Sequence, residues 1–138
     1  MEQYSDRRSV LLVEDEVLVR LSIAEELRQA GLTVLEAANA DEASTVLESH
    51  SQWVGLVLTD IQMPGRLDGI GLVRLIRGRY PDVHVIVLSG AQPEKLQDVE
   101  ADAILAKPHS ATELIAHIRR LLGGNTSNGS RNSNARNS

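Results

Sequence analysis

The feature that most constrains the fold is a repeated alternation of short apolar runs with amphipathic stretches. The runs are rich in β-branched side chains and have the length of buried parallel strands. Three clear runs lie at residues 10–13, 54–58 and 83–88, and two weaker candidates lie at residues 33–37 and 103–106. The chain is therefore expected to form five strands.

The stretches between these runs show helical periodicity or signals that begin a helix. Val19, Ile23 and Leu27 share one helical face, and Gly31 follows them as a C-terminal stop. Further helices are indicated by Asn39 with Glu42, by the face of Ile70, Val73 and Ile76, by Pro93, and by Ser110 with Glu113. The two capping patterns predict helices over about 40–49 and 111–122. Strict alternation favours an α/β fold, a doubly wound five-stranded parallel sheet with five helices, because right-handed crossovers leave few other ways to bury the strands.

Length and composition limit the classes of function. A chain of 138 residues has room for one ordinary domain, and the residues from 123 to 138 are rich in Asn and Ser, so we expect a domain over 8–122 and a flexible tail over 123–138. The net charge of -5 and the lack of a basic stripe argue against a direct nucleic-acid surface. Without cysteine the chain has no disulfide or thiolate zinc site. No apolar stretch reaches membrane-spanning length, and we expect a cytoplasmic protein without membrane insertion.

Polar residues follow the predicted strands at positions that would meet at one edge of the sheet. They are Glu14 and Asp15 after the first strand, Asp60 after the third, Ser89 after the fourth and Lys107 after the fifth. Three converging carboxylates repel by roughly 4 kcal/mol per pair at about 4 Å and an effective dielectric constant of about 20, so a cation is needed. Oxygen ligands of this kind suit Mg²⁺ or Mn²⁺. With the metal held, Asp60 could attack a phosphoryl group while Lys107 and Ser89 take up the charge on its oxygens.

Several segments of the chain together form a specific set of motifs. They are Val10-Leu11-Leu12-Val13-Glu14-Asp15-Glu16, Leu58-Thr59-Asp60-Ile61-Gln62-Met63-Pro64-Gly65, Asp68-Gly69, Val87-Leu88-Ser89-Gly90 and Lys107-Pro108. On these segments the chain closely resembles the bacterial response-regulator receiver domain of two-component systems, over about residues 8–122. The resemblance implies a flavodoxin-like fold and a phosphoprotein that acts as a switch in signal transduction.

The resemblance also implies roles for individual residues. Asp60 would accept a phosphoryl group from the phosphohistidine of a sensor histidine kinase or a histidine phosphotransfer protein. Glu14, Asp15, Asp60 and the main-chain carbonyl of Gln62 would hold Mg²⁺, and Ser89 and Lys107 would contact the phosphoryl group. We expect a stand-alone response regulator in a phosphorelay, which signals to a downstream protein by protein contacts. Such a domain is not an enzyme beyond catalysing its own phosphorylation and dephosphorylation.

Three positions depart from the usual receiver pattern. The loop over 65–69 is one residue longer than the commonest form, which leaves the expected metal ligands in place but alters the surface beside them. Ile104 stands where many receivers have a Tyr or Phe switch, so coupling of the hydroxyl to an aromatic ring cannot run unchanged. His109 stands where an apolar or aromatic residue often follows Lys-Pro.

Other readings of the same residues remain open. A phosphohydrolase on a similar sheet usually has a second aspartate two residues after the nucleophile as acid and base, and here that position is Gln62, which cannot supply a proton. A degenerate receiver used as a constitutive binding module is disfavoured by the complete set of site residues, although Ile104 keeps it open. The stripe of Leu114, Ile118 and Leu121 could pack on the sheet or partly serve a homodimer.

Overall fold

A computed structural model describes residues 7–61, 68–90, 96, 99–107 and 110–123. Five parallel strands form one sheet in the order β2-β1-β3-β4-β5. The strands are β1 (Ser9–Val13), β2 (Val34–Ala37), β3 (Val54–Asp60), β4 (His84–Ser89) and β5 (Ala103–Ala106). This is the order of the flavodoxin-like doubly wound fold, and it confirms the predicted sheet.

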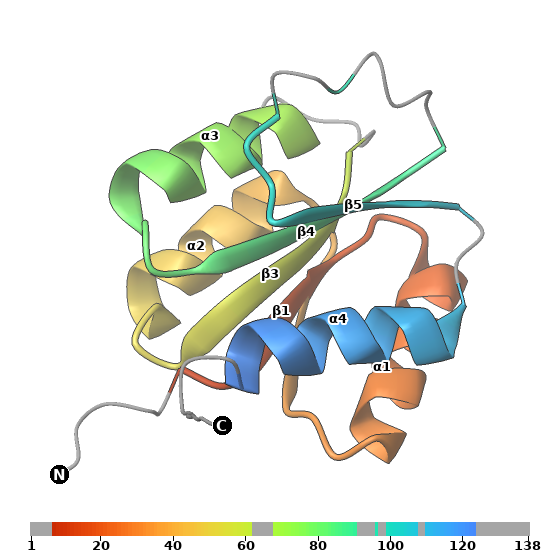
Figure 1. Ribbon diagram of the computed structural model, residues 1–138. Coiled ribbons are helices and arrows are strands. Elements are labelled where there is room, and N and C mark those ends of the chain that lie inside the picture. The colour runs from red at the N-terminus through yellow and green to blue at the C-terminus, as the bar shows by residue number, and fades with distance from the viewer. Residues whose placement is uncertain (1–6, 62–67, 91–95, 97–98, 108–109, 124–138) are drawn as a thin grey trace, which may run out of the picture.

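Helices cover both faces of the sheet. The structure has α1 (Val17–Gln29), α2 (Ala40–His50), α3 (Gly69–Arg79) and α4 (Ala111–Gly123). In Figure 1, α2 and α3 lie on one face, and α1 and α4 lie on the other. The remaining helix, expected to begin at Pro93, falls outside the described residues except for Leu96, which is buried. Within the described part of the chain, no helix is long and apolar enough to cross a membrane.

Local signals set where the helices begin and end. The side chain of Asn39 accepts a hydrogen bond from the main-chain N–H of Glu42 at 2.8 Å, and the Ser110 hydroxyl accepts one from Glu113 at 3.2 Å. These bonds satisfy main-chain donors that have no partner inside the helix. Beyond the end of α1, Gly31 has a φ of +91°, which favours glycine. The predicted caps and the predicted stop are confirmed.

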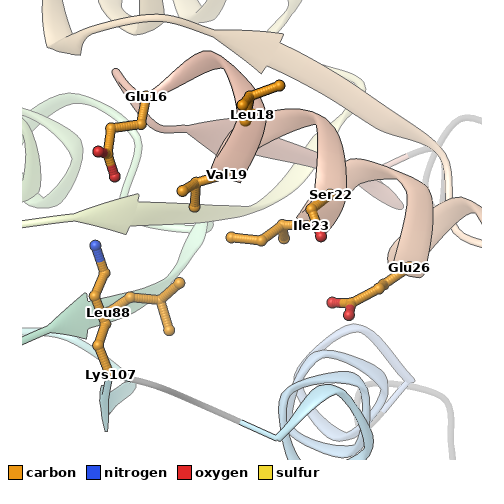
Figure 2. Close-up of a pocket in the computed structure, with 8 residues that line it drawn as sticks. All are labelled: Glu16, Leu18, Val19, Ser22, Ile23, Glu26, Leu88 and Lys107. Carbon is orange, nitrogen blue, oxygen red and sulfur yellow. The ribbon is translucent and has the colours of Figure 1, made fainter.

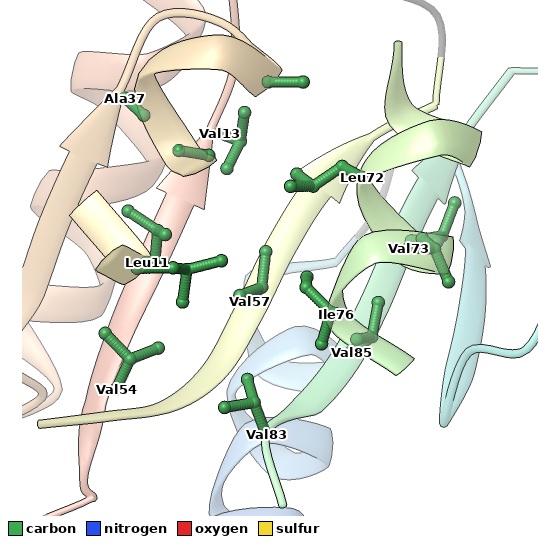
Figure 3. Packing of buried hydrophobic residues seen from close by; sticks show 14 of the residues in the cluster. Leu11, Val13, Ala37, Val54, Val57, Leu72, Val73, Ile76, Val83 and Val85 are labelled. Carbon is green, nitrogen blue, oxygen red and sulfur yellow. The ribbon is translucent and has the colours of Figure 1, made fainter. Parts of the chain in front are cut away.

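Alternate residues of each strand build two apolar cores, one on each face of the sheet. The core under α2 and α3, shown in Figure 3, includes Leu11, Val57, Val85, Leu47 and Ile76. The core under α1 and α4 includes Leu12, Leu58, Ile86, Leu27 and Leu114. Ile118 is buried in this second core and Leu121 packs against it, so the apolar stripe of α4 packs on the sheet.

Two central strands run further than the apolar pattern indicates. The apolar runs end at Leu58 and Leu88, whereas β3 continues to Asp60 and β4 continues to Ser89. The reason is main-chain pairing, because Asp60 lies opposite Leu88 and Ser89 lies opposite Ala106 in the parallel ladder. Asp60 and Ser89 are thus terminal residues of buried strands rather than parts of the following loops.

A carboxylate clamps α3 to β4 at the opposite end of the sheet from these residues. Asp102 accepts hydrogen bonds from the Val85 main-chain N–H at 2.7 Å and from the Arg77 guanidinium at 2.9 Å. Burial acts to raise the pKa of Asp102, but the Val85 N–H and the hydrogen bond and charge of Arg77 outweigh it, so the pKa lies below its usual value. The ionised carboxylate therefore stabilises the folded state.

Asp102→Asn is expected to lower the free energy of unfolding by about 1 kcal/mol at neutral pH, because the amide keeps one acceptor but loses the charge. A carboxyl whose pKa is depressed in the folded state stabilises above its unfolded pKa, and this contribution is lost as pH falls through the folded pKa. The difference between variant and wild type should therefore shrink below a pH of about 3.8. Urea unfolding across this range measures it, with the exposed Asp82→Asn as control, and a difference that grows at low pH would contradict the assignment.

Candidate functional site

Four of the residues expected at the site meet at the carboxyl edge of the sheet. Glu14 and Asp15 directly follow β1, Asp60 ends β3, and Lys107 directly follows β5. One carboxylate oxygen from each of Glu14, Asp15 and Asp60 lies within 4.8 Å of the other two. The structure thus brings three acidic groups from two adjacent strands into one cluster.

Lys107 supplies the positive charge in this cluster. Its Nζ donates a hydrogen bond to Oδ2 of Asp60 at 2.7 Å and lies 3.7 Å from Oε1 of Glu14. Burial acts to lower the pKa of Lys107, but the hydrogen bond and charge of Asp60 and the charge of Glu14 outweigh it, and the pKa is raised. Lys107 is therefore an ammonium group at neutral pH.

Glu14 has a buried carboxylate oxygen that makes no hydrogen bond within the described residues. Its side chain is almost fully buried, and its Oε2 accepts a hydrogen bond from the Glu16 main-chain N–H at 3.1 Å. Its Oε1 is buried and has no hydrogen-bond partner within the described residues. Burial raises the pKa of Glu14, although the Glu16 N–H and the charge of Lys107 act to lower it. A buried carboxylate oxygen that no donor reaches is suited to binding a cation.

The donor set fits a hard divalent cation. Carboxylate oxygens are the ligands that Mg²⁺ and Mn²⁺ prefer, and the site offers no sulfur or imidazole ligand among the clustered residues. Glu14, Asp15 and Asp60 are placed to supply such oxygens. The fourth expected ligand, the main-chain carbonyl of Gln62, lies outside the described residues.

Ser89 is placed at the same edge on the strand next to Asp60. It is the last residue of β4 and is 2% exposed, and its main-chain carbonyl accepts a hydrogen bond from the Lys107 N–H at 3.0 Å. This bond ties the end of β4 to the residue that pairs with Asp60. Ser89 therefore shares the carboxyl edge with Asp60 and Lys107.

Two residues that sequence reasoning did not place at the site also contact it. A Cβ added to Gly69 would lie 2.5 Å from the Asp60 carbonyl oxygen and 2.6 Å from Cα of Ile61, so only glycine lets α3 approach the end of β3 this closely. The Asp68-Gly69 motif was the available signal. Arg20 donates a hydrogen bond to the main-chain carbonyl of Glu14 at 2.8 Å, and no local pattern indicated this contact.

An apolar groove of about 580 Å³ lies beside the cluster. Figure 2 shows Val19 and Ile23 of α1, with Glu16 just before the helix, on one side of it and Leu88 and Lys107 opposite them. The same helix has an exposed apolar surface at its N-terminal half. Val17 is 55% exposed, Leu18 is 81% exposed and Leu21 is 50% exposed.

Comparisons with known proteins agree with this geometry. The family model described as the response regulator receiver domain matches residues 10–119. The chain is 37% identical over 122 residues to the sensor kinase CckA of Brucella abortus, a match that covers 86% of this chain and 13% of that protein. It is 36% identical over 115 residues to the transcriptional regulatory protein PdtaR of Mycobacterium tuberculosis, covering 80% of this chain and 55% of PdtaR. The chain thus spans only part of these relatives.

Solved structures give the same result. The receiver domain of the Francisella response regulator 1452 superposes with a TM-score of 0.77 at 26% identity, covering 87% of this chain and 99% of that one. The response regulator TrrA of Thermotoga maritima, solved in complex with Mg²⁺ and BeF, superposes with a TM-score of 0.75 at 28% identity, covering 83% and 98%. With a family match over most of its length and the acidic cluster at the carboxyl edge, this chain belongs to the response regulator receiver domain family.

Proposed function

We propose that the domain over 8–122 accepts a phosphoryl group on Asp60 from the phosphohistidine of a sensor histidine kinase or a histidine phosphotransfer protein. The reaction depends on Mg²⁺, and the product signals to a cytoplasmic partner through protein contacts. The observation that carries this proposal is the 2.7 Å contact of Asp60 with Lys107 inside a cluster of three carboxylates. A paired, buried carboxylate beside further oxygen ligands is the arrangement that phosphoryl transfer to an aspartate requires.

In the proposed step, a carboxylate oxygen of Asp60 attacks the phosphorus atom. A P–O bond forms, the P–N bond to the donor histidine breaks, and the imidazole nitrogen leaves with the electron pair and takes up a proton. Lys107 is protonated at neutral pH and already contacts Asp60, so it can pair with the phosphoryl oxygens after transfer. The Ser89 hydroxyl is proposed as a second contact to these oxygens.

Glu14, Asp15 and Asp60 would hold the metal ion, together with the carbonyl of Gln62. When bound, Mg²⁺ would neutralise charge on the phosphoryl oxygens, and Mn²⁺ has similar ligand preferences. The single positive charge of Lys107 cannot neutralise three carboxylates, so a second cation would relieve the remaining repulsion. The buried Oε1 of Glu14, which has no hydrogen-bond partner within the described residues, supports its assignment as a ligand.

The exposed apolar surface of α1 supports contact with a protein donor. Val17, Leu18 and Leu21 lie on the helix that follows the acidic loop, and the adjoining groove is lined by Lys107. A donor that brings a phosphohistidine to Asp60 must cover the surface around this edge. Exposed apolar side chains beside a reaction site are suited to such a contact.

Incubation with acetyl phosphate and Mg²⁺ is expected to add one phosphoryl group to the wild-type chain, detected by intact mass. Asp60→Asn should lose the adduct completely, because an amide oxygen is a far weaker nucleophile than a carboxylate. Asp82→Asn, an exposed aspartate away from the edge, is the matched control and should keep the adduct. Retention of the adduct in Asp60→Asn would place the acceptor elsewhere.

Mg²⁺ affinity is expected to rise when beryllofluoride occupies the phosphoryl position, because the added negative charge and ligands complete the coordination of the ion. Asp15→Asn should weaken Mg²⁺ binding by about tenfold or more through loss of a charged ligand. Glu16→Gln changes the neighbouring exposed carboxylate and should have a much smaller effect. Isothermal titration of each variant measures this, and equal losses in both variants would indicate a general charge effect instead of a ligand.

Leu18→Ala is expected to slow phosphoryl transfer from a purified phosphodonor protein by about tenfold, the loss typical of removing an interface anchor. Its rate of phosphorylation by acetyl phosphate should stay unchanged, because the small donor needs no docking surface. Trp53→Ala is the control, since Trp53 is 44% exposed but precedes β3 at the other end of the sheet. A loss of rate with both kinds of donor would show that Leu18 acts on the site itself.

A further inference from the structure

Arg20 of α1 joins the acidic loop to the edge strand of the sheet. Its NH1 donates to the main-chain carbonyl of Glu14 at 2.8 Å, and its Nε donates to Oε1 of Glu36 in β2 at 3.2 Å. The Arg20 side chain is 16% exposed and that of Glu36 is 24% exposed, so water competes only in part for these bonds. The guanidinium thus binds one main-chain group and one carboxylate at the same time.

These bonds fix the main chain of Glu14 from two sides. The Glu14 N–H donates to the carbonyl of Ala37 at the end of β2 at 3.1 Å, and the Glu14 carbonyl accepts from Arg20. Ala37 belongs to β2, and Arg20 is bound to β2 through Glu36. The direction of the chain through Glu14 and Asp15 is therefore set by the edge strand.

Glu36 has a second arginine partner that does not reach the site. Arg28 donates to Oε2 of Glu36 at 3.1 Å and to the main-chain carbonyl of Val34 at 2.9 Å. Arg20 and Arg28 therefore share one carboxylate, and only Arg20 contacts Glu14. The chain itself offers a matched comparison between the two arginines.

We propose that Arg20, held by Glu36, is a positioning residue for the metal site. It holds the Glu14 carbonyl so that the carboxylates of Glu14 and Asp15 face Asp60. This inference rests on the proposed Mg²⁺ site and adds residues that do not touch the ion. Hydrogen bonds to the groups that carry metal ligands orient those ligands, and their loss lowers metal affinity.

Electrostatics and positioning predict opposite results when Arg20 is replaced. Removing a positive charge near three carboxylates would by itself strengthen Mg²⁺ binding. Losing the bond that orients Glu14 would weaken it. A weaker affinity in Arg20→Gln therefore cannot be a charge effect.

The test is Mg²⁺ titration of the full chain by calorimetry, with the fold of each variant verified by circular dichroism. Arg20→Gln should weaken Mg²⁺ binding on the order of tenfold. Arg20→Lys should recover part of the loss, because one ammonium group cannot reproduce the fork that spans Glu14 and Glu36. Arg28→Gln removes the same charge and shares Glu36, and its affinity should be unchanged or slightly higher.

Two further measurements separate positioning from a general loss of structure. Glu36→Gln should weaken binding in the wild-type background and add little to Arg20→Gln, since it acts through Arg20. Without metal, exchange of the Glu16 amide proton, which is donated to Glu14, should be faster in Arg20→Gln than in Arg28→Gln. If Arg20→Gln does not fold, Arg20→Lys carries the test, because it keeps the charge and loses only the fork, and wild-type affinity in Arg20→Lys would overturn the positioning role.

The outcomes distinguish this inference from the proposed function. Unchanged or tighter Mg²⁺ binding in Arg20→Gln, with binding still lost in Asp15→Asn, would overturn the positioning role and leave the metal site in place. Absence of Mg²⁺ binding in the wild type, or its persistence in Asp15→Asn, would overturn the proposed site instead. Equal weakening in Arg20→Gln and Arg28→Gln would also overturn the positioning role.

Discussion

The register of the parallel strands determines which side chains meet at the functional edge. Val13 lies opposite Thr59, Asp60 opposite Leu88 and Ser89 opposite Ala106, so the strand ends are stepped across the sheet. Because side chains alternate between faces, a slip of one residue in β3 would turn Asp60 away from Lys107 and place Thr59 there. The slip would also exchange the side chains of β3 between the two apolar cores, so that neither core would keep its packing. Core packing thus fixes the register, and the register fixes the site.

The charge distribution at this edge follows from that placement. One carboxylate oxygen from each of the three residues lies within 4.8 Å of the other two, and the Lys107 ammonium pairs with Asp60 and Glu14. Burial raises the pKa of Glu14. Like charges about 4 Å apart repel by roughly 4 kcal/mol per pair, and the single ammonium of Lys107 neutralises only one of the three negative charges, so the cluster accommodates an additional cation. In the proposed reaction, the excess of negative charge would draw a metal ion to the site, and the ion would supply positive charge to the oxygens of the phosphoryl group.

Most of the fold could be predicted from local patterns, because strands, caps and stops depend on short stretches of sequence. The helix starts at Asn39 and Ser110 and the stop at Gly31 are examples, since each acts on main-chain groups within a few residues. The ends of β3 and β4 could not be predicted in this way. Their last residues are polar, and only pairing with a neighbouring strand extends the ladder to Asp60 and Ser89.

The candidate site could also be predicted only in part from the sequence. Its carboxylates and lysine could be assigned from the rule that parallel strands share a carboxyl edge, and the structure places them together. Contacts between distant residues gave no sequence signal. Arg20 and Glu36 are sixteen positions apart, and the need for glycine at position 69 arises from the approach of α3 to Asp60. Ile104, the departure from an aromatic switch, is 39% exposed and pairs with Val87 in the ladder between β4 and β5.

The first two turns of α1 contribute a core residue, a residue that holds the acidic loop and an exposed apolar side chain. Ile23 is buried in the core with β1 and β3, Arg20 holds the Glu14 carbonyl, and Leu18 faces solvent beside the groove that Lys107 lines. Leu18 and Arg20 are two positions apart in the first turn of this helix, so the exposed apolar face and the contact to Glu14 belong to one short segment. A donor protein that contacts Leu18 would therefore act on the same segment that orients the proposed metal ligands. In the proposed function, this short segment of α1 would thus serve both the docking of the donor and the orientation of the metal ligands.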